Sequence, residues 1–270
     1  MTGQGSFMID IHHHLLFGLD DGPSDIEISV AMAEMSVKNG VTHIVCTPHS
    51  SEQFKFDPAI NQERMEMIQK RLGNRVTLGL GCDFHLMFDN IEDAIKNPGK
   101  YSINGKQYLL VEFPDHGISQ NMKEIFFRLG TVGLTSIITH PERNPLLARN
   151  PERMIDWLRA GCLIQITAAS LTGRFGKIAQ RVSHELLRRN WVNFIATDAH
   201  DLTSRPPMLR DAYQLVKDKY GAETAERLCV LNPRAAFFGE PMPSQPEPEG
   251  LHPELDIKQS SGLLSRMFGR

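Results

Sequence analysis

The chain has 270 residues, enough for one large α/β domain or two small ones, and 41% of them are hydrophobic, which allows a sizeable core. Its net charge of −3 implies no general affinity for nucleic acid. No apolar run approaches the roughly 18 residues of a membrane-spanning helix, and residues 1–7 lack the basic and apolar segments of a signal peptide.

A histidine cluster follows the first predicted strand, at residues 8–12. Residues i and i+2 of a strand point to the same side, so His12 and His14 can offer two imidazoles to one point while His13 faces away. Imidazole is the commonest protein ligand for divalent transition metals. We interpret this stretch as part of a metal site; the alternatives are a solvated polar turn and a tag, although a tag is a longer histidine run that is not fused to a strand.

Asp21 lies in the turn that comes next, before a helix that Ser24 can cap and that ends at Lys38. Turn and cap chemistry alone would explain this aspartate. Because it follows His14 so closely, its carboxylate could instead reach the same face as the histidines. Both interpretations are open at this point.

Apolar strand-like runs alternate with helical patterns through the body of the chain, which spans residues 8–239. The predicted strands are residues 8–12, 43–47, 76–80, 108–113, 135–140, 163–167 and 194–197. The predicted helices are residues 24–38, 58–72, 120–129, 151–160, 176–190 and 208–220. Continuous hydrophobic strands that alternate with helices favour a parallel sheet covered by helices. Seven such strands predict a (β/α)7 barrel, with a doubly wound open sheet as the alternative.

Side chains of the kind that bind metals stand at the carboxyl ends of six predicted strands. In chain order they are His12 and His14, His49, Asp83 with His85, Glu112, His140, and Asp198 with His200. A single histidine at a strand end is usually capped or exposed. Charged groups that recur at the same end of buried strands are costly unless they are paired or bound to metal. Since these ends meet on one face of a barrel, the pattern predicts a metal site there.

The composition changes after residue 239. Residues 240–250 are rich in proline and acidic side chains, which is typical of a disordered linker, and we expect 240–270 to form a disordered tail. Its apolar, basic end at 262–270 resembles a weak amphipathic anchor, although a frayed terminus is the favoured interpretation. Four widely spaced cysteines in apolar surroundings indicate buried thiols in a reducing compartment, so we expect a cytoplasmic protein.

Several short motifs together resemble the PHP (polymerase and histidinol phosphatase) superfamily. They are Asp10-Ile11-His12-His13-His14, Asp20-Asp21-Gly22-Pro23, Thr47-Pro48-His49, Glu112-Phe113, Thr139-His140-Pro141-Glu142-Arg143, Thr197-Asp198-Ala199-His200 and Arg205-Pro206-Pro207. The second, fifth and last of these favour a narrower resemblance, to the bacterial metal-dependent tyrosine phosphatases of capsule and exopolysaccharide biosynthesis, the CpsB/CapC type. The resemblance covers roughly residues 8–239, and the motifs are specific in combination rather than singly.

The resemblance implies a single domain, a distorted TIM-like (β/α)7 barrel, with two or three divalent ions: manganese first, with iron, zinc or magnesium as alternatives. It implies the ligands His12, His14, Asp21, His49, Asp83, Glu112, His140, Asp198 and His200. The first ion would take His12, His14, Asp83 and Asp198, the second Asp83, Glu112 and His140, and the third Asp21, His49 and His200. The bridging residue of the family is usually glutamate. Here it is Asp83, one methylene shorter, and His85 is a candidate to compensate.

A divalent ion lowers the pKa of bound water toward about 7, which suits hydrolysis of a phosphate ester by direct attack of water on phosphorus. Arg143 and Arg205 lie close in sequence to predicted ligands, and we expect their guanidinium forks to hold the phosphoryl oxygens; a surface ion pair is the alternative. A cysteine phosphatase needs arginine six residues after its cysteine, where this chain has Glu52, Phe88, Ala168 and Ala235. No P-loop motif occurs either.

The resemblance implies a protein-tyrosine phosphatase, a phosphoric monoester hydrolase, that acts on the tyrosine-rich tail of a bacterial autokinase controlling polysaccharide export. Two alternatives are a small-molecule phosphatase such as histidinol phosphatase and a metal-binding scaffold without catalysis. A nuclease role is disfavoured because no strongly basic groove is evident. A homo-oligomer is compatible with the sequence.

Overall fold

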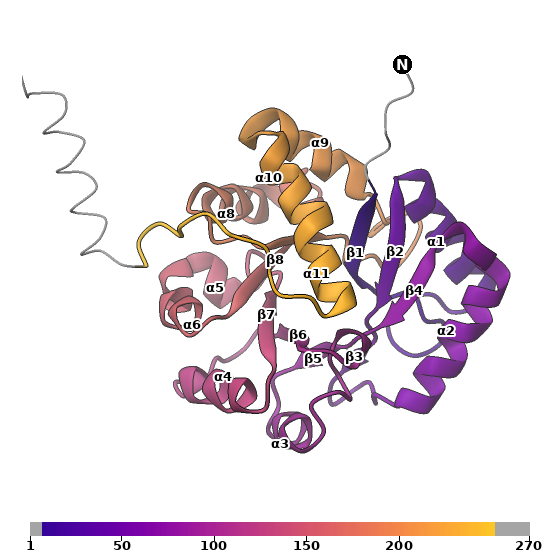
Figure 1. The fold of residues 1–270 in the computed structure, drawn as a ribbon, viewed down its shortest axis with the longest axis horizontal. Helices are drawn as coiled ribbons and strands as arrows, with labels where there is room; N and C mark the ends of the chain where they lie inside the picture. The colour runs from indigo at the N-terminus through magenta and orange to yellow at the C-terminus, as the bar shows by residue number, and fades with distance from the viewer. Residues whose placement is uncertain (1–6, 252–270) are drawn as a thin grey trace, which may run out of the picture.

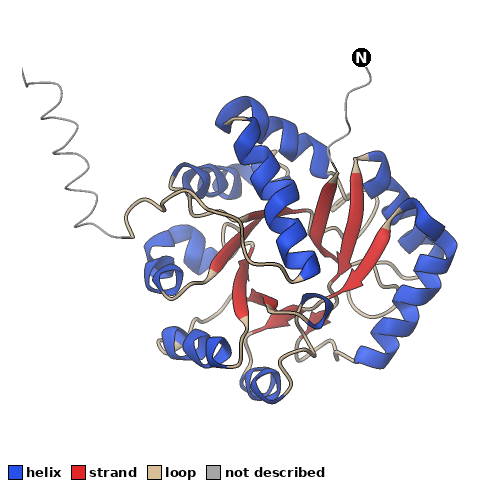
Figure 2. Cartoon of the chain, viewed as in Figure 1, coloured by secondary structure: helices blue, strands red, loops and turns tan. Residues whose placement is uncertain are grey.

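Parallel strands form the centre of the molecule and helices surround them (Figures 1 and 2). The computed structural model describes residues 7–251. Its strands are β1 (Met8–His13), β2 (Val41–Cys46), β3 (His49–Ser50), β4 (Thr77–Leu80), β5 (Asp83–His85), β6 (Tyr108–Glu112), β7 (Thr135–Thr139), β8 (Leu163–Thr167) and β9 (Phe194–Ala196). Most strand residues are buried, because helices cover the outer side of the sheet and side chains fill the inner side.

Two strands of the barrel are interrupted near the end that carries the predicted metal site. β2 continues as β3 after Thr47 and Pro48, and β4 continues as β5 after Gly81 and Cys82. The pairing runs across the breaks, since the amide of Gly81 donates to the carbonyl of Cys46 at 2.9 Å and the amide of Asp83 donates to that of Pro48 at 3.2 Å. Each interrupted pair therefore acts as one strand of the barrel.

All the strand pairs are parallel, in the orders β1-β2-β4 and β3-β5-β6-β7-β8-β9. The ring closes between β9 and β1. There the amide of Asp198 donates to the carbonyl of His12 at 2.8 Å, and the amide of His14 donates to that of Ala199 at 2.9 Å. The predicted (β/α)7 barrel is thereby confirmed, and the open doubly wound sheet is excluded.

The helices are α1 (Ile26–Lys38), α2 (Pro58–Leu72), α3 (Phe88–Lys96), α4 (Met122–Thr131), α5 (Pro145–Arg149), α6 (Ile155–Arg159), α7 (Ala168–Leu171), α8 (Gly176–Arg188), α9 (Leu209–Tyr220), α10 (Ala222–Glu226) and α11 (Asn232–Phe238), with a π-helix at Arg227–Leu231. All six predicted helices occur, although the predicted helix 151–160 begins with the 3-10 turn Pro151–Met154. The predicted cap of α1 is one residue too early. The Asp25 carboxylate, not Ser24, accepts from the amides of Glu27 and Ile28.

A second apolar core lies inside the barrel and is separate from the larger core between strands and helices. It includes Ile9 and Ile11 of β1, Leu110 of β6 and Phe194 of β9. Helix α11 closes it by contributing Phe237, and Figure 1 shows this helix lying across the barrel. Apolar side chains therefore fill the end of the barrel that α11 closes. The polar residues of the barrel are concentrated at the opposite end, at the carboxyl ends of the strands.

Residues 240–251 lie along the barrel without forming a helix or strand, although their composition predicts a disordered linker. The indole nitrogen of Trp191 donates to the carbonyl of Glu249 at 2.8 Å, and the amide of Glu249 donates to the carbonyl of Arg189 at the same distance. Arg159 holds the carbonyl of Leu251, whose side chain is buried. Side chains of the barrel thus supply hydrogen bonds that composition does not reveal. The apolar, basic end at 262–270 lies outside the described residues.

All four cysteines are buried and unpaired, as predicted. Burial raises the pKa of each of their thiols. Within residues 7–251, no helix has the length and apolar character needed to cross a membrane.

Candidate metal centre

The nine predicted ligands converge at the carboxyl ends of the strands. Together with His85 they form overlapping groups, and within each group the ligand atoms lie within 4.8 Å of one another. The groups are His14, Asp21, His49 and His200; His12, His140 and Asp198; His12, His14 and Asp83; Asp83, Glu112 and His140; and His49, His85 and Glu112. His13 belongs to none of them and instead packs beside Ser36, as the strand alternation predicts.

Asp83 lies between the predicted ligands of the first and second ions. Its Oδ2 atom is 3.4 Å from Nε2 of His12, 3.3 Å from Nδ1 of His49 and 4.0 Å from Nε2 of His140. The other carboxylate oxygen is 3.5 Å from the hydroxyl of Thr139. A single oxygen of the short side chain therefore faces one histidine from each of the three predicted ligand sets.

Asp198 joins the histidines to the two predicted arginines. Its Oδ1 atom is 3.4 Å from Nε2 of both His12 and His14. Its Oδ2 atom accepts hydrogen bonds from Arg143 and, at 2.8 Å, from Arg205. Both guanidinium groups thus lie at the edge of the cluster, where they would contact a ligand bound beside the histidines.

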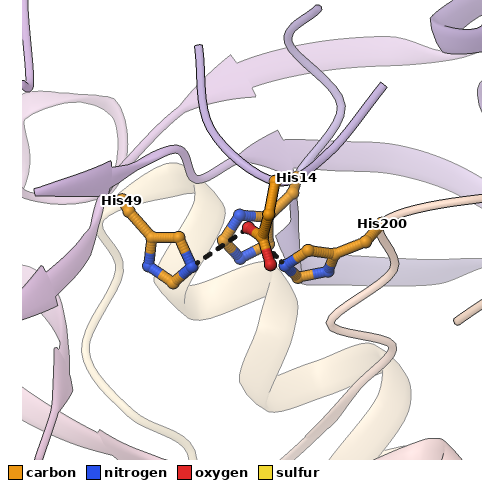
Figure 3. A group of neighbouring side chains, drawn as sticks. His14, His49 and His200 are labelled. Atoms are coloured by element: carbon orange, nitrogen blue, oxygen red, sulfur yellow. Dashed lines mark ion pairs between the residues drawn. The ribbon is translucent and has the colours of Figure 1, made fainter. Parts of the chain in front are cut away.

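The third predicted group lies at the more open side of the cluster. Figure 3 shows His14, His49 and His200 turned toward one another. The Oδ1 atom of Asp21 is 3.4 Å from Nε2 of His49 and 3.3 Å from Nε2 of His200. Asp21 therefore does more than form a turn: its half-exposed carboxylate reaches the histidines.

Three histidines are oriented through their second ring nitrogen. Nδ1 of His12 is 2.9 Å from the amide oxygen of Gln165, and Nδ1 of His14 is 2.8 Å from Oδ2 of Asp20. Nδ1 of His200 is 2.9 Å from the carbonyl oxygen of Asp198. Each contact leaves Nε2 facing the cluster, as in metal-ligating histidines. Neither Gln165 nor Asp20 was predicted to have a role. The available signals were the inward register of Gln165 on its strand and the position of Asp20 beside Asp21.

Two residues of the cluster have left-handed backbone conformations. His140 has φ 32° and Asp198 has φ 52°. The amide of His140 donates to the carbonyl of Gln165 at 2.8 Å, which holds the turn after β7 in place. Non-glycine residues adopt such conformations at a cost, and they concentrate at functional sites, where the surrounding structure enforces them.

Several candidate ligand atoms of the cluster are buried without a hydrogen-bond partner: Asp83 Oδ2, Asp198 Oδ1, His49 Nδ1 and His200 Nε2. Buried polar atoms nearly always have a partner. Carboxylate oxygens that face imidazole nitrogens at these spacings are satisfied when a cation lies between them. The residues therefore fit divalent ions held by nitrogen and oxygen ligands.

The charges of the cluster compensate one another. Burial by itself would raise the pKa of Asp83 and Asp198, but His12 and other nearby positive groups hold both well below the usual range. Burial would lower the pKa of His14, but its carboxylate neighbours raise it to about 10. Burial and the charge of His14 lower the pKa of His200 to about 4.

Glu112 divides its two oxygens between different histidines. Its Oε1 atom is 3.6 Å from Nε2 of His140. Its Oε2 atom contacts Nε2 of His85 and lies 3.6 Å from Nδ1 of His49. The structure therefore places His85, which the family resemblance does not include among the ligands, directly against one of them.

We expect His85→Ala to weaken metal binding about 10- to 100-fold, because it removes the side chain that orients Glu112. The measurement is bound metal per chain, by mass spectrometry, after dialysis against graded chelator. His184→Ala is the matched control, since His184 lies on α8 against Tyr220 and away from the cluster. Equal metal retention in the two variants would show that Glu112 does not depend on His85.

Comparisons with known proteins agree with this geometry. Residues 8–237 match the family model described as capsular polysaccharide synthesis, CpsB/CapC. Tyrosine-protein phosphatase YwqE of Bacillus subtilis (strain 168) is 32% identical over 245 residues, which cover 87% of this chain and 96% of the relative. Tyrosine-protein phosphatase CpsB of Streptococcus pneumoniae is 31% identical over 242 residues, which cover 86% and 99%.

Solved structures give the same result. A structure from the work on B. subtilis YwqE and S. pneumoniae CpsB, which describes them as metal-dependent tyrosine phosphatases, has a TM-score of 0.83 at 30% identity, covering 89% of this chain and 99% of that one. A Lactococcus lactis histidinol phosphate phosphatase has a TM-score of 0.51 at 14% identity, covering 81% and 93%, and shows the shared fold alone. The chain belongs to the CpsB/CapC family of capsular polysaccharide synthesis proteins.

Proposed function

We propose that this chain is a metal-dependent protein-tyrosine phosphatase, a hydrolase of phosphoric monoesters. The observation that carries the proposal is the cluster of histidines and carboxylates with Arg143 and Arg205 at its edge. The names of the relatives, tyrosine-protein phosphatases of comparable length, support it. We infer that the substrate is a phosphotyrosine protein, the tail of a bacterial tyrosine autokinase that regulates capsule or exopolysaccharide synthesis.

The proposed ligands form three sets that share members. The first is His12, His14, Asp83 and Asp198, the second is Asp83, Glu112 and His140, and the third is Asp21, His49 and His200. Imidazole and carboxylate donors without thiolate suit manganese, with iron, zinc or magnesium as alternatives. Bound divalent ions would polarise the phosphoryl group and lower the pKa of water.

Arg143 and Arg205 are proposed to bind the phosphoryl oxygens. Both side chains are about three-quarters buried, with exposed fractions of 25% and 23%. Their shared contact with Asp198 holds them in place before substrate arrives. Guanidinium forks match phosphoryl geometry, and positioned charges of this kind stabilise the transition state without reorganising.

The cysteines offer no alternative nucleophile. All four thiols are buried and have raised pKa values, so little thiolate forms near neutral pH. Their free, buried state also supports the proposal that the protein is cytoplasmic.

We expect metal-reconstituted protein to release phosphate from a phosphotyrosine peptide, and chelator to abolish that release. Histidinol phosphate serves as the competing substrate, and phosphate release is measured for both with and without chelator. Release from histidinol phosphate alone would identify a small-molecule phosphatase. No release from either compound by protein with full metal content would favour a binding scaffold.

A further inference from the structure

A pocket of about 410 Å³ lies beside the metal centre, between α5 and α8, which are neighbours on one side of the barrel (Figure 1). Pro145 and Ala148 line it from α5, and Phe175, Ile178 and Ala179 line it from the start of α8. The volume is within the roughly 300–1,000 Å³ of small-molecule sites, and such sites are mostly apolar with a few polar groups. Nothing in the metal cluster itself uses this pocket.

Arg143 separates the pocket from the metal centre. On one side, its guanidinium contacts Asp198, and its side chain lines a smaller cavity with Glu112 and His140. On the other side, its guanidinium carbon lies 4.5 Å from the ring centre of Phe175, within the range of a cation–π contact. A ligand whose anionic group meets Arg143 at the cluster can therefore extend an apolar group past Phe175.

We propose that this pocket binds the aromatic ring of the phosphotyrosine substrate. The inference rests on the proposed function and deepens it. In phosphotyrosine the ring is attached directly to the phosphoryl ester oxygen, so a phosphoryl group held by Arg143 places the ring next to that side chain. Phe175 then offers its ring for an offset or edge contact, and Ile178 packs from α8. An alkyl phosphate cannot make these contacts, so the pocket favours aryl phosphate esters over alkyl phosphate esters.

The rim of the pocket carries a positive charge. Arg149, at the end of α5, is exposed, and among residues 7–251 it forms no ion pair.

Competitive inhibition distinguishes the contribution of the aromatic ring to binding from that of the phosphoryl group. Benzylphosphonate carries both groups, whereas inorganic phosphate carries only the second. Ile178→Ala trims the pocket without touching Arg143, and Phe175→Ala removes its aromatic wall. We expect both variants to raise the Ki of benzylphosphonate, about tenfold for Phe175→Ala, and Ile178→Ala to leave the Ki of phosphate within about twofold. Phe127→Ala on α4, where the side chain is 65% exposed, is the matched control.

Three outcomes would overturn the pocket assignment: unchanged benzylphosphonate inhibition in both variants, equal weakening of phosphate and benzylphosphonate in Ile178→Ala, or an equal effect of Phe127→Ala. Hydrolysis of a phosphotyrosine peptide by the wild-type protein is measured in parallel. If the wild type hydrolyses the peptide and the variants do not discriminate between the inhibitors, only the pocket assignment fails. If the wild type neither hydrolyses the peptide nor binds phosphate, the proposed function fails as well.

Discussion

Asp198→Ala is expected to lose bound metal and phosphatase activity together, with turnover of a phosphotyrosine peptide reduced at least 100-fold. Loss of a residue that only orients a ligand costs about 10- to 100-fold, and Asp198 is placed as a ligand itself. The variant also leaves Arg143 and Arg205 without their shared carboxylate. Metal content by mass spectrometry and phosphate release are measured on the same preparation.

Asp198 also lies where β9 meets β1, so folding must be checked in this variant by circular dichroism and thermal melting. Asp198→Asn keeps the shape of the side chain and an oxygen acceptor, and we expect it to fold while still binding metal weakly. Asp218→Ala, at an exposed position of α9, is the control for losses of metal or activity during protein preparation. Wild-type turnover in Asp198→Ala would refute the proposed site.

Arg143→Ala is expected to keep its metal but lose about 100- to 1,000-fold in kcat/KM for a phosphotyrosine peptide. This is the usual cost of removing one positioned donor from a transition-state site. Lysine is a point charge that cannot replace a planar fork, so Arg143→Lys should recover little of the loss. The Ki of inorganic phosphate should rise in both variants.

The control for Arg143 is Arg153→Ala, an exposed arginine in the 3-10 turn before α6. If Arg143 served only as an ion-pair partner of Asp198, its loss would change the metal content and leave the Ki of phosphate unchanged in protein with full metal occupancy. Metal content and the Ki of phosphate therefore distinguish substrate binding from a purely structural ion pair.

The seven predicted strands could be recognised because each is a short apolar run, which a strand buried on both faces requires. Several details escaped the pattern, among them the short helices α3, α5, α7 and α10. The breaks that create β3 and β5 depend on pairing between neighbouring strands, such as that from Gly81 to Cys46. Helix α11 was missed because it is short and mostly buried, so it lacks the polar face that makes a surface helix recognisable.

The candidate ligands could likewise be named from the sequence, because a parallel barrel brings the carboxyl ends of all its strands to one face. Strand alternation was enough to separate His13 from His12 and His14. Contacts between distant segments could not be deduced in this way. Gln165 supports His12 across 153 positions of sequence, and no local pattern records that contact.

The sequence by itself determined the barrel, the face that carries the chemistry and the residue types gathered there, because strand period and strand direction are local properties. Only the tertiary structure decided which side-chain atoms of the site contact one another. It placed His85 against Glu112, turned both arginines onto Asp198, and opened the pocket behind Arg143 between α5 and α8. Those arrangements depend on distances between side chains of separate strands and helices. Packing sets these distances, and the order of residues in the sequence does not reveal them.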